Sequence, residues 1–108
     1  MNRRTRAEIL ESLREKERNR ALILGTGAGT GLSAVAEEKG GADLIIVYGT
    51  GKYRMAGRSS MAGRFAFGNA NDLVLKMAQE VMPVAPHTPV LAGVFIQDPF
   101  RDMMGFIE

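Results

Sequence analysis

The chain alternates between short apolar runs and longer segments in which apolar residues recur every three to four positions. Runs without apolar–polar alternation predict strands, and they occur at 21–24, 43–48 and 90–96. Such runs are typical of parallel strands that are covered on both faces. Helical spacing predicts four helices, at about 6–18, at 32–39, from Asn69 or Asn71 up to Pro83, and from Asp98 onward.

Capping signals mark where two of these helices begin. Thr5 and Glu8 form a capping box, in which each side chain accepts a hydrogen bond from the other residue's backbone amide. Asp98 followed by Pro99 is typical of an N-cap residue with proline in the first helical position. The first helix has a narrow apolar stripe, so we expect residues 1–20 to form a leading amphipathic helix on a larger body.

The order of the elements predicts an α/β fold with a leading helix and about three strand–helix units with parallel strands. A parallel sheet needs helices on both faces, and three strands make a poor closed core. A complete (β/α)8 TIM barrel needs about 250 residues, whereas this sequence has 108. We therefore expect residues 1–108 to form one partial domain, the N-terminal part of such a barrel, which associates or stays molten when alone.

The stretch from Tyr48 to Asn71 combines glycine with positive charge. It contains five glycines, no Asp or Glu, and the four cations Lys52, Arg54, Arg58 and Arg64. Long irregular connections are usually functional or disordered, and the aromatic residues of this stretch are not typical of a disordered linker. Neighbouring cations repel one another, so an ordered loop needs distant carboxylates or a bound anion. We predict an anion-binding loop, with a solvated basic loop as the alternative.

A second glycine-rich stretch, residues 25–31, separates the first predicted strand from the next helix. Backbone amides at a helix N-terminus can cradle a phosphate, but the spacing does not match known nucleotide-binding motifs. Thr30 stands where G-x-G-x-x-G needs its third glycine, and neither Gly25 nor Gly27 is followed by the Gly-Lys pair of a P-loop. An anion-binding loop and a tight turn both stay open, because each needs the backbone freedom of glycine.

Composition and charge narrow the classes of function. Residues 1–20 carry seven Arg or Lys against four Glu, and the remainder seven against eight, a bias too weak to predict a nucleic-acid partner. Cysteine is absent, which excludes a disulfide framework and a thiolate metal site. The sequence has neither a signal-peptide core nor a membrane-spanning apolar run, so we expect no membrane partner and a cytoplasmic location. His87, the single histidine, is interpreted as a turn residue.

Five blocks of residues, in order through nearly all of 5–102, carry a family resemblance. They are Gly-Ala-Gly-Thr-Gly-Leu-Ser at 27–33, Gly-Gly-Ala-Asp-Leu-Ile-Ile-Val-Tyr at 40–48, Tyr-Arg-Met-Ala-Gly-Arg at 53–58, Gly-Asn-Ala-Asn at 68–71 and His-Thr-Pro-Val-Leu-Ala-Gly-Val at 87–94. They resemble the phosphoenolpyruvate hydrolase-like family, whose barrel also occurs in Tm-1-like plant proteins. The resemblance implies a TIM barrel of the phosphoenolpyruvate/pyruvate type, whose better-known members bind small oxyacids through Mg²⁺.

The site of such a barrel forms from the loops after the C-terminal ends of the strands, which are 25–33, 48–71 and 95–99 here. Arg54 and Arg58 can bind a carboxylate or phosphate through bidentate pairs. The expected substrate-binding residues are Gly27, Gly29, Ser33, Tyr53, Arg54 and Arg58. Asp98 is a candidate Mg²⁺ ligand, with the N-cap as its alternative role. The sequence departs from the family pattern at 49–52 and at Arg64, which stands where an apolar residue is expected.

The leading hypothesis is a hydrolase- or lyase-type enzyme that acts on a small phosphorylated or carboxylated oxyacid. No acid–base pair is evident, so the catalytic residues stay unassigned and these residues alone are expected to be inactive. The alternative is a non-catalytic TIM barrel for binding or signal transduction, and a nucleotide-binding module is a third, disfavoured by the glycine spacing. A homo-oligomer is expected, because a partial barrel exposes apolar edges.

Overall fold

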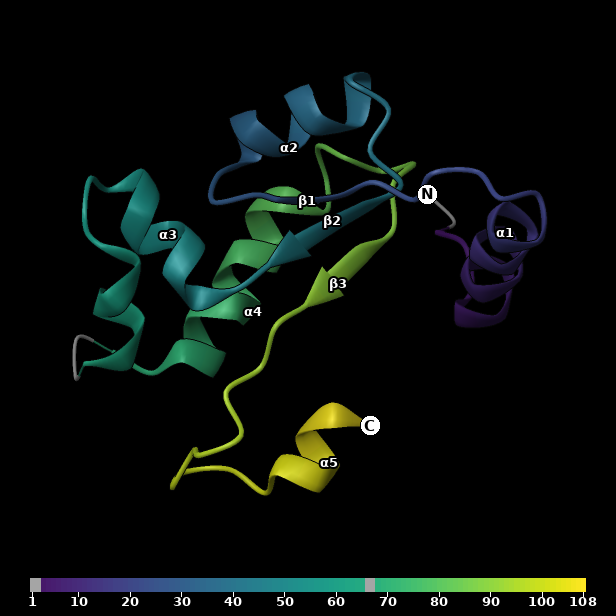
Figure 1. Cartoon of the computed structure of the whole chain (residues 1–108). Coiled ribbons are helices and arrows are strands. Elements are labelled where there is room, and N and C mark those ends of the chain that lie inside the picture. The colour runs from purple at the N-terminus through teal and green to yellow at the C-terminus, as the bar shows by residue number, and fades with distance from the viewer. Residues whose placement is uncertain (1–2, 66–67) are drawn as a thin grey trace.

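Three short parallel strands form the sheet of the computed structural model, which describes residues 3–65 and 68–108. The strands lie in the order β1 (Gly25–Gly27), β2 (Leu44–Val47) and β3 (Val90–Ala92). Ile45 of the central strand pairs with Thr26 on one side and Val90 on the other. Because all three strands run the same way, their C-terminal ends meet at one edge of the sheet, toward α3 in Figure 1.

Helices connect the three strands, and one further helix precedes the first strand and one follows the last. In chain order they are α1 (Arg6–Arg18), α2 (Gly31–Lys39), α3 (Gly49–Met55), the 3-10 helix η1 (Ser60–Arg64), α4 (Ala70–Val81) and α5 (Met103–Ile107). Figure 1 shows α3 beyond the C-terminal ends of the strands and α1 at the opposite end of the sheet. The predicted capping box of α1 is confirmed, since Thr5 donates its amide to Glu8 (2.6 Å) and Glu8 its amide to Thr5 (3.3 Å).

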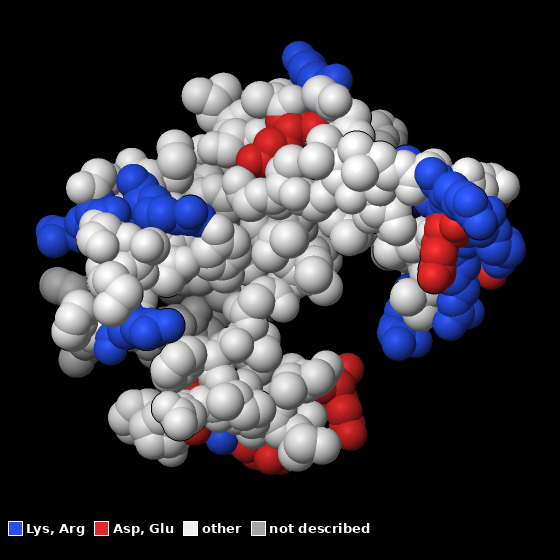
Figure 2. Space-filling view, viewed as in Figure 1, with Lys and Arg blue, Asp and Glu red and all other residues white. Residues whose placement is uncertain are grey.

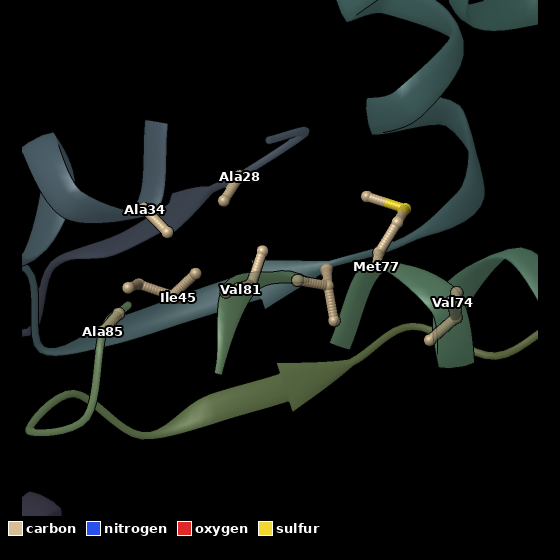
Figure 3. Packing of buried hydrophobic residues seen from close by; sticks show 8 residues of the cluster. Ala28, Ala34, Ile45, Val74, Met77, Val81 and Ala85 are labelled. Carbon is tan, nitrogen blue, oxygen red and sulfur yellow. The ribbon is translucent and has the colours of Figure 1, made fainter. Parts of the chain in front are cut away.

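One face of the sheet carries the core. Ile45 and Val47 alternate with half-buried neighbours along β2 and are fully buried against α2 and α4. Figure 3 shows how the α4 side chains Val74, Met77 and Val81 lie over this strand. The spacing of these three residues is the one from which the helix was predicted, and Asn69 is confirmed as its N-cap.

The opposite face of the sheet is uncovered in the described part of the chain. Ile46 and Tyr48 point to this face and are half-buried, while Leu91, paired with Ile46, is 53% exposed. The prediction that β2 is covered on both faces is therefore wrong for the described residues. Along β2 the buried Ile45 and Val47 alternate with the half-buried Leu44 and Ile46.

Polar contacts hold α1 and the turn before β3 at the N-terminal end of the sheet. Lys16 of α1 lies 2.5 Å from the carboxylate of Asp43, directly before β2. Glu38 of α2 accepts the backbone amides of His87 (3.1 Å) and Thr88 (2.9 Å). His87 itself is exposed in the turn, where its place between two prolines predicts it.

Four elements differ from the sequence predictions. The strand predicted at 21–24 does not form there, since β1 comprises Gly25–Gly27 of the predicted glycine loop, the residues that lie opposite β2. The third strand ends at Ala92 rather than at 96. The side chain of Asn71 accepts a hydrogen bond from the amide of Phe95 (2.8 Å) and donates one to its carbonyl (2.9 Å), so these groups are not available to a neighbouring strand.

The other two differences concern helices. The basic stretch after β2 is mostly helical, as α3 and η1, rather than an irregular loop. The last helix begins at Met103 and not after Asp98, whose carboxylate accepts the amide of Phe100 (2.9 Å) and makes a turn there.

Candidate functional site

Tyr48 occupies the C-terminal edge of the sheet, directly after β2. A Cβ atom placed on Gly27 of β1 would lie 3.2 Å from the Tyr48 hydroxyl, and one placed on Gly93 would lie 2.9 Å from Tyr48 Cβ. The tyrosine therefore lies against glycine positions at the ends of both neighbouring strands. Any side chain at Gly93 would meet it closer than normal van der Waals contact.

Arg54 of α3 joins Tyr48 at this edge. Its guanidinium donates a hydrogen bond to the Tyr48 hydroxyl and lies 5.2 Å from the centroid of the ring. The guanidinium has five N–H donors, and Arg54 is exposed. The edge thus presents a cation with donors available to an anion, which agrees with the sequence prediction for the position of Arg54.

Gly29 has a packing role. It is buried, and a Cβ atom there would lie 2.3 Å from Met55 Cγ and 2.5 Å from the Gly51 carbonyl oxygen. Glycine at position 29 therefore allows the β1–α2 connection to pack directly on α3. This close approach is a third explanation beside the turn and the anion-binding loop that the sequence leaves open.

The N-terminus of α2 already holds an anion of the protein itself. Glu80 of α4 accepts the amide of Gly31 at 2.8 Å, and Lys52 of α3 lies 3.5 Å from its other oxygen. The Gly31 hydrogen bond is the main cause that lowers the pKa of Glu80, burial opposes it, and Lys52 lowers it further. Ser33 lies in the same turn, where its amide and hydroxyl contact the Thr30 hydroxyl (3.2 and 2.9 Å).

The remaining cations of the basic stretch lie on the surface. Figure 2 shows Lys and Arg side chains over the region of α3 and η1, at the left, apart from the mixed charges of α1 at the right. Arg58 is exposed after α3, and Tyr53 is half-buried within it. Arg64 lines a cavity of about 440 Å³ together with Phe65, Phe95 and Phe100. Contact of Arg58 and Tyr53 with a ligand stays a prediction.

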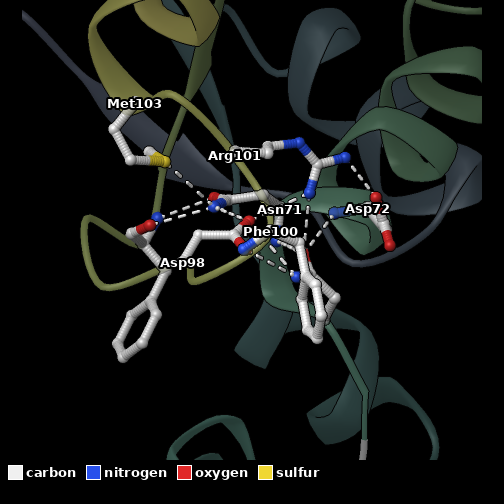
Figure 4. A network of polar contacts seen from close by, with 8 residues as sticks. Asn71, Asp72, Asp98, Phe100, Arg101 and Met103 are labelled. Atoms are coloured by element: carbon white, nitrogen blue, oxygen red, sulfur yellow. Dashed lines mark hydrogen bonds and ion pairs between the residues drawn. The ribbon is translucent and has the colours of Figure 1, made fainter.

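Asp98 is the centre of a polar cluster between α4 and the segment after β3 (Figure 4). Its side chain is 1% exposed and accepts hydrogen bonds from Asn71 (2.9 Å), Asn69 (3.2 Å), Arg101 (3.0 Å) and the Phe100 amide (2.9 Å). These donors, the Asn71 side chain first and the Phe100 amide second, hold the pKa of Asp98 far below its usual range, although burial alone would raise it.

The cluster does not fit a Mg²⁺ ion. The groups that contact the Asp98 oxygens are all N–H donors, whereas Mg²⁺ needs oxygen ligands. Within residues 3–65 and 68–108, no three His, Asp or Glu side chains stand close enough to hold a metal ion. Asp98 here fixes the chain after β3 to the start of α4. These N–H donors give the predicted metal-ligand role of Asp98 no support, and the proposed function does not depend on it.

Sequence reasoning missed two residues of this edge. Tyr48 directly follows an apolar run and ends a family-like block, which is a signal for the C-terminal end of a strand. Glu80 has no local signal, because its partner Gly31 lies 49 residues earlier. None of the helices in the described residues is long and apolar enough to cross a membrane.

Comparison with known proteins gives relatives that are much longer than this chain. The ToMV resistance protein Tm-1(GCR237) of Solanum lycopersicum is 50% identical over 103 residues, covering 95% of the chain and 14% of the relative. The susceptible protein tm-1(GCR26) of the same species matches to the same extent. The putative transcriptional regulatory protein y4pA of Sinorhizobium fredii is 36% identical over 96 residues, covering 87% of the chain and 16% of the relative.

The family comparison covers nearly the whole chain. The model of the phosphoenolpyruvate hydrolase-like family matches residues 8–108. The match includes all three strands and the C-terminal edge at Tyr48 and Arg54. The chain belongs to the phosphoenolpyruvate hydrolase-like family.

Proposed function

We propose that this chain forms the N-terminal part of a TIM barrel that binds a small phosphorylated or carboxylated oxyacid at the C-terminal edge of its strands. The strands are parallel and separated by helices, and the sheet packs on α2 and α4 with one face only. This arrangement suits part of a barrel wall whose inner face would pack against the remaining strands. In TIM barrels the active site forms from the loops at that edge. Family membership supports this reading of the fold.

The observation that carries the proposal is the Arg54 guanidinium at the edge, held against Tyr48. Arginine suits planar oxyanions, which it binds through paired N–H donors. Arg58, a few residues later in the family-like block, is the second cation proposed for the ligand. We propose that the whole protein hydrolyses the oxyacid or cleaves it in a lyase reaction. This chain spans only 14–16% of the length of its relatives.

A non-catalytic barrel is the second candidate. It is favoured by the composition of the edge, because the residues described around Tyr48 and Arg54 include no carboxylate–histidine pair for acid–base work. An assay of the whole protein with phosphoenolpyruvate distinguishes the two candidate functions. Release of phosphate or pyruvate supports the enzyme, and binding without turnover supports the binding protein.

Calorimetric titration of the whole protein with phosphoenolpyruvate tests the site. Arg54→Ala or Arg58→Ala should weaken binding by about 1.5–3 kcal/mol, the scale of a hydrogen bond to a charged group. Arg64→Ala, and Arg14→Ala on α1 as a matched control, should change it far less. If all these variants lost affinity equally and slightly, and if added salt removed the difference, the cations would form only a diffuse basic surface. The specific site would then be abandoned.

A further inference from the structure

We infer that Tyr48 is a positioning residue, which fixes the Arg54 guanidinium at the C-terminal edge before a ligand arrives. The inference deepens the proposed function and rests on it for the identity of the ligand. The contact itself does not depend on any ligand. It joins the residue after the central strand to a helix that begins at the next residue.

The neighbouring strands of the sheet determine the position of Tyr48. Glycine at 27 and at 93 leaves room for its ring and backbone at the ends of β1 and β3, and the ring lies on the uncovered face. Tyr48 is also the N-cap of α3 and is extended there, with φ −157° and ψ 155°. Tyr48 is therefore placed by rigid elements, because its backbone begins α3, its Cβ lies next to Gly93 and its hydroxyl lies next to Gly27, as suits a group that must hold another side chain.

The fixed position of Tyr48 lowers the conformational freedom of the Arg54 side chain. A free arginine samples many rotamers, and ordering it when a ligand binds costs free energy. The hydrogen bond to the Tyr48 hydroxyl and the contact with the ring order the guanidinium beforehand. A hydroxyl that accepts from Arg54 can still donate its own proton, so the pair offers that proton and the remaining guanidinium N–H groups to a ligand. That chemistry selects an oxyanion, a carboxylate or a phosphate group.

Tyr48→Phe separates the hydroxyl from the ring, because phenylalanine keeps the packing between Gly27 and Gly93. The first measurement needs no ligand: phenylglyoxal labelling of arginines in the whole protein, followed by peptide mass spectrometry. In the wild type Arg54 should react more slowly than exposed Arg14 of α1. Tyr48→Phe should raise the Arg54 rate several-fold and leave Arg14 unchanged.

The second measurement is the affinity for phosphoenolpyruvate. Tyr48→Phe should weaken it about three- to tenfold, the worth of one hydrogen bond, and should add nothing when Arg54 is already alanine. An Arg54 rate equal to that of Arg14 in the wild type, or one unchanged by Tyr48→Phe, overturns the inference. A raised Arg54 rate in a protein that does not bind phosphoenolpyruvate supports the positioning role and rejects the proposed function.

Discussion

The glycines around β1 differ in what a side chain would meet there. A Cβ atom at Gly25 would lie 3.6 Å from the Ile46 side chain, an ordinary contact, whereas one at Gly29 would lie 2.5 Å from the backbone oxygen of Gly51. The sequence makes the two positions look alike, since both belong to one glycine-rich stretch. The difference arises from α3, which packs on Gly29 alone of the two.

Substitution of these two glycines tests that difference. Gly29→Ala should lower the free energy of unfolding by about 1–3 kcal/mol, because the backbone oxygen of α3 must move to admit the methyl group. Gly25→Ala is the matched control and should stay within about 0.5 kcal/mol of the wild type. Urea denaturation of the three proteins measures the effect. Equal losses at both positions would show that α3 does not pack on Gly29 in this way.

At the scale of elements, the polar cluster at Asp98 ties α5 and its leading segment to α4. Arg101 pairs with both Asp98 and Asp72, and its guanidinium lies 4.9 Å from the ring of Phe106 in α5. Asn71, the second residue of α4, takes both backbone groups of Phe95. The segment after β3 has little other packing, since Phe95, Ile96 and Phe100 are exposed. Its position therefore depends on these polar contacts.

Asp98→Asn should release this segment, because an asparagine amide would face the donors of Asn71 and Arg101. Hydrogen exchange at the Phe95 and Phe100 amides should become faster, while Asp102→Asn, at an exposed carboxylate, should leave it unchanged. The pKa of Asp98 is lowered in the folded state. Its stabilising effect is therefore present above its unfolded pKa of about 4 and is lost as the pH falls below that value.

Acid denaturation measures this pH dependence. The wild type should lose stability as the pH falls below about 4, and Asp98→Asn should lose less over the same range, because it has no carboxylate to protonate. Unchanged hydrogen exchange and stability in Asp98→Asn at neutral pH would argue against the view that the polar cluster at Asp98 holds the segment after β3. The N-cap role predicted for Asp98 is wrong, because α5 begins at Met103 and Asp102 is its N-cap.

Local signals explain which elements the sequence predicts well. The bounds of α1 and α4 follow from the Thr5 capping box and the Asn69 cap, each within a few residues of its partners. The ends of β1 and β3 depend on contacts between distant segments, which spacing does not record. The candidate site likewise has one feature that the sequence predicts and one that it does not. The position of Arg54 at the strand edge follows from the order of the elements, but its contact with Tyr48 requires the fold of α3.

At the scale of the molecule, the residues that the structure describes leave one sheet face packed and the other open. Leu91, which lies on the open face, is 53% exposed, and Leu22, Val94 and Ile96 are exposed in the segments before β1 and after β3. Exposed apolar side chains on a sheet face are typical of an interface. We therefore propose that this face is covered by further barrel strands in the whole protein, and by self-association when the 108 residues are alone.

Sedimentation of the 108-residue chain over a range of concentrations tests this proposal. The wild type should associate, and Leu91→Lys should shift it toward the monomer, because a charge on the open face opposes burial. Leu75→Lys is the matched control, since Leu75 is 48% exposed on α4, away from that face. A strictly monomeric wild type with a sharp cooperative melt would contradict the proposal.

Glu80 at the start of α2 has a consequence for anions in solution. It is a tethered competitor, and its effective concentration at the Gly31 amide is set by the packing of α4 on α2 rather than by diffusion. A free phosphate must displace it before it can reach that amide. The helix end is thereby closed to weakly binding anions, whereas the exposed Arg54 contacts the neutral hydroxyl of Tyr48 and keeps further N–H donors for them.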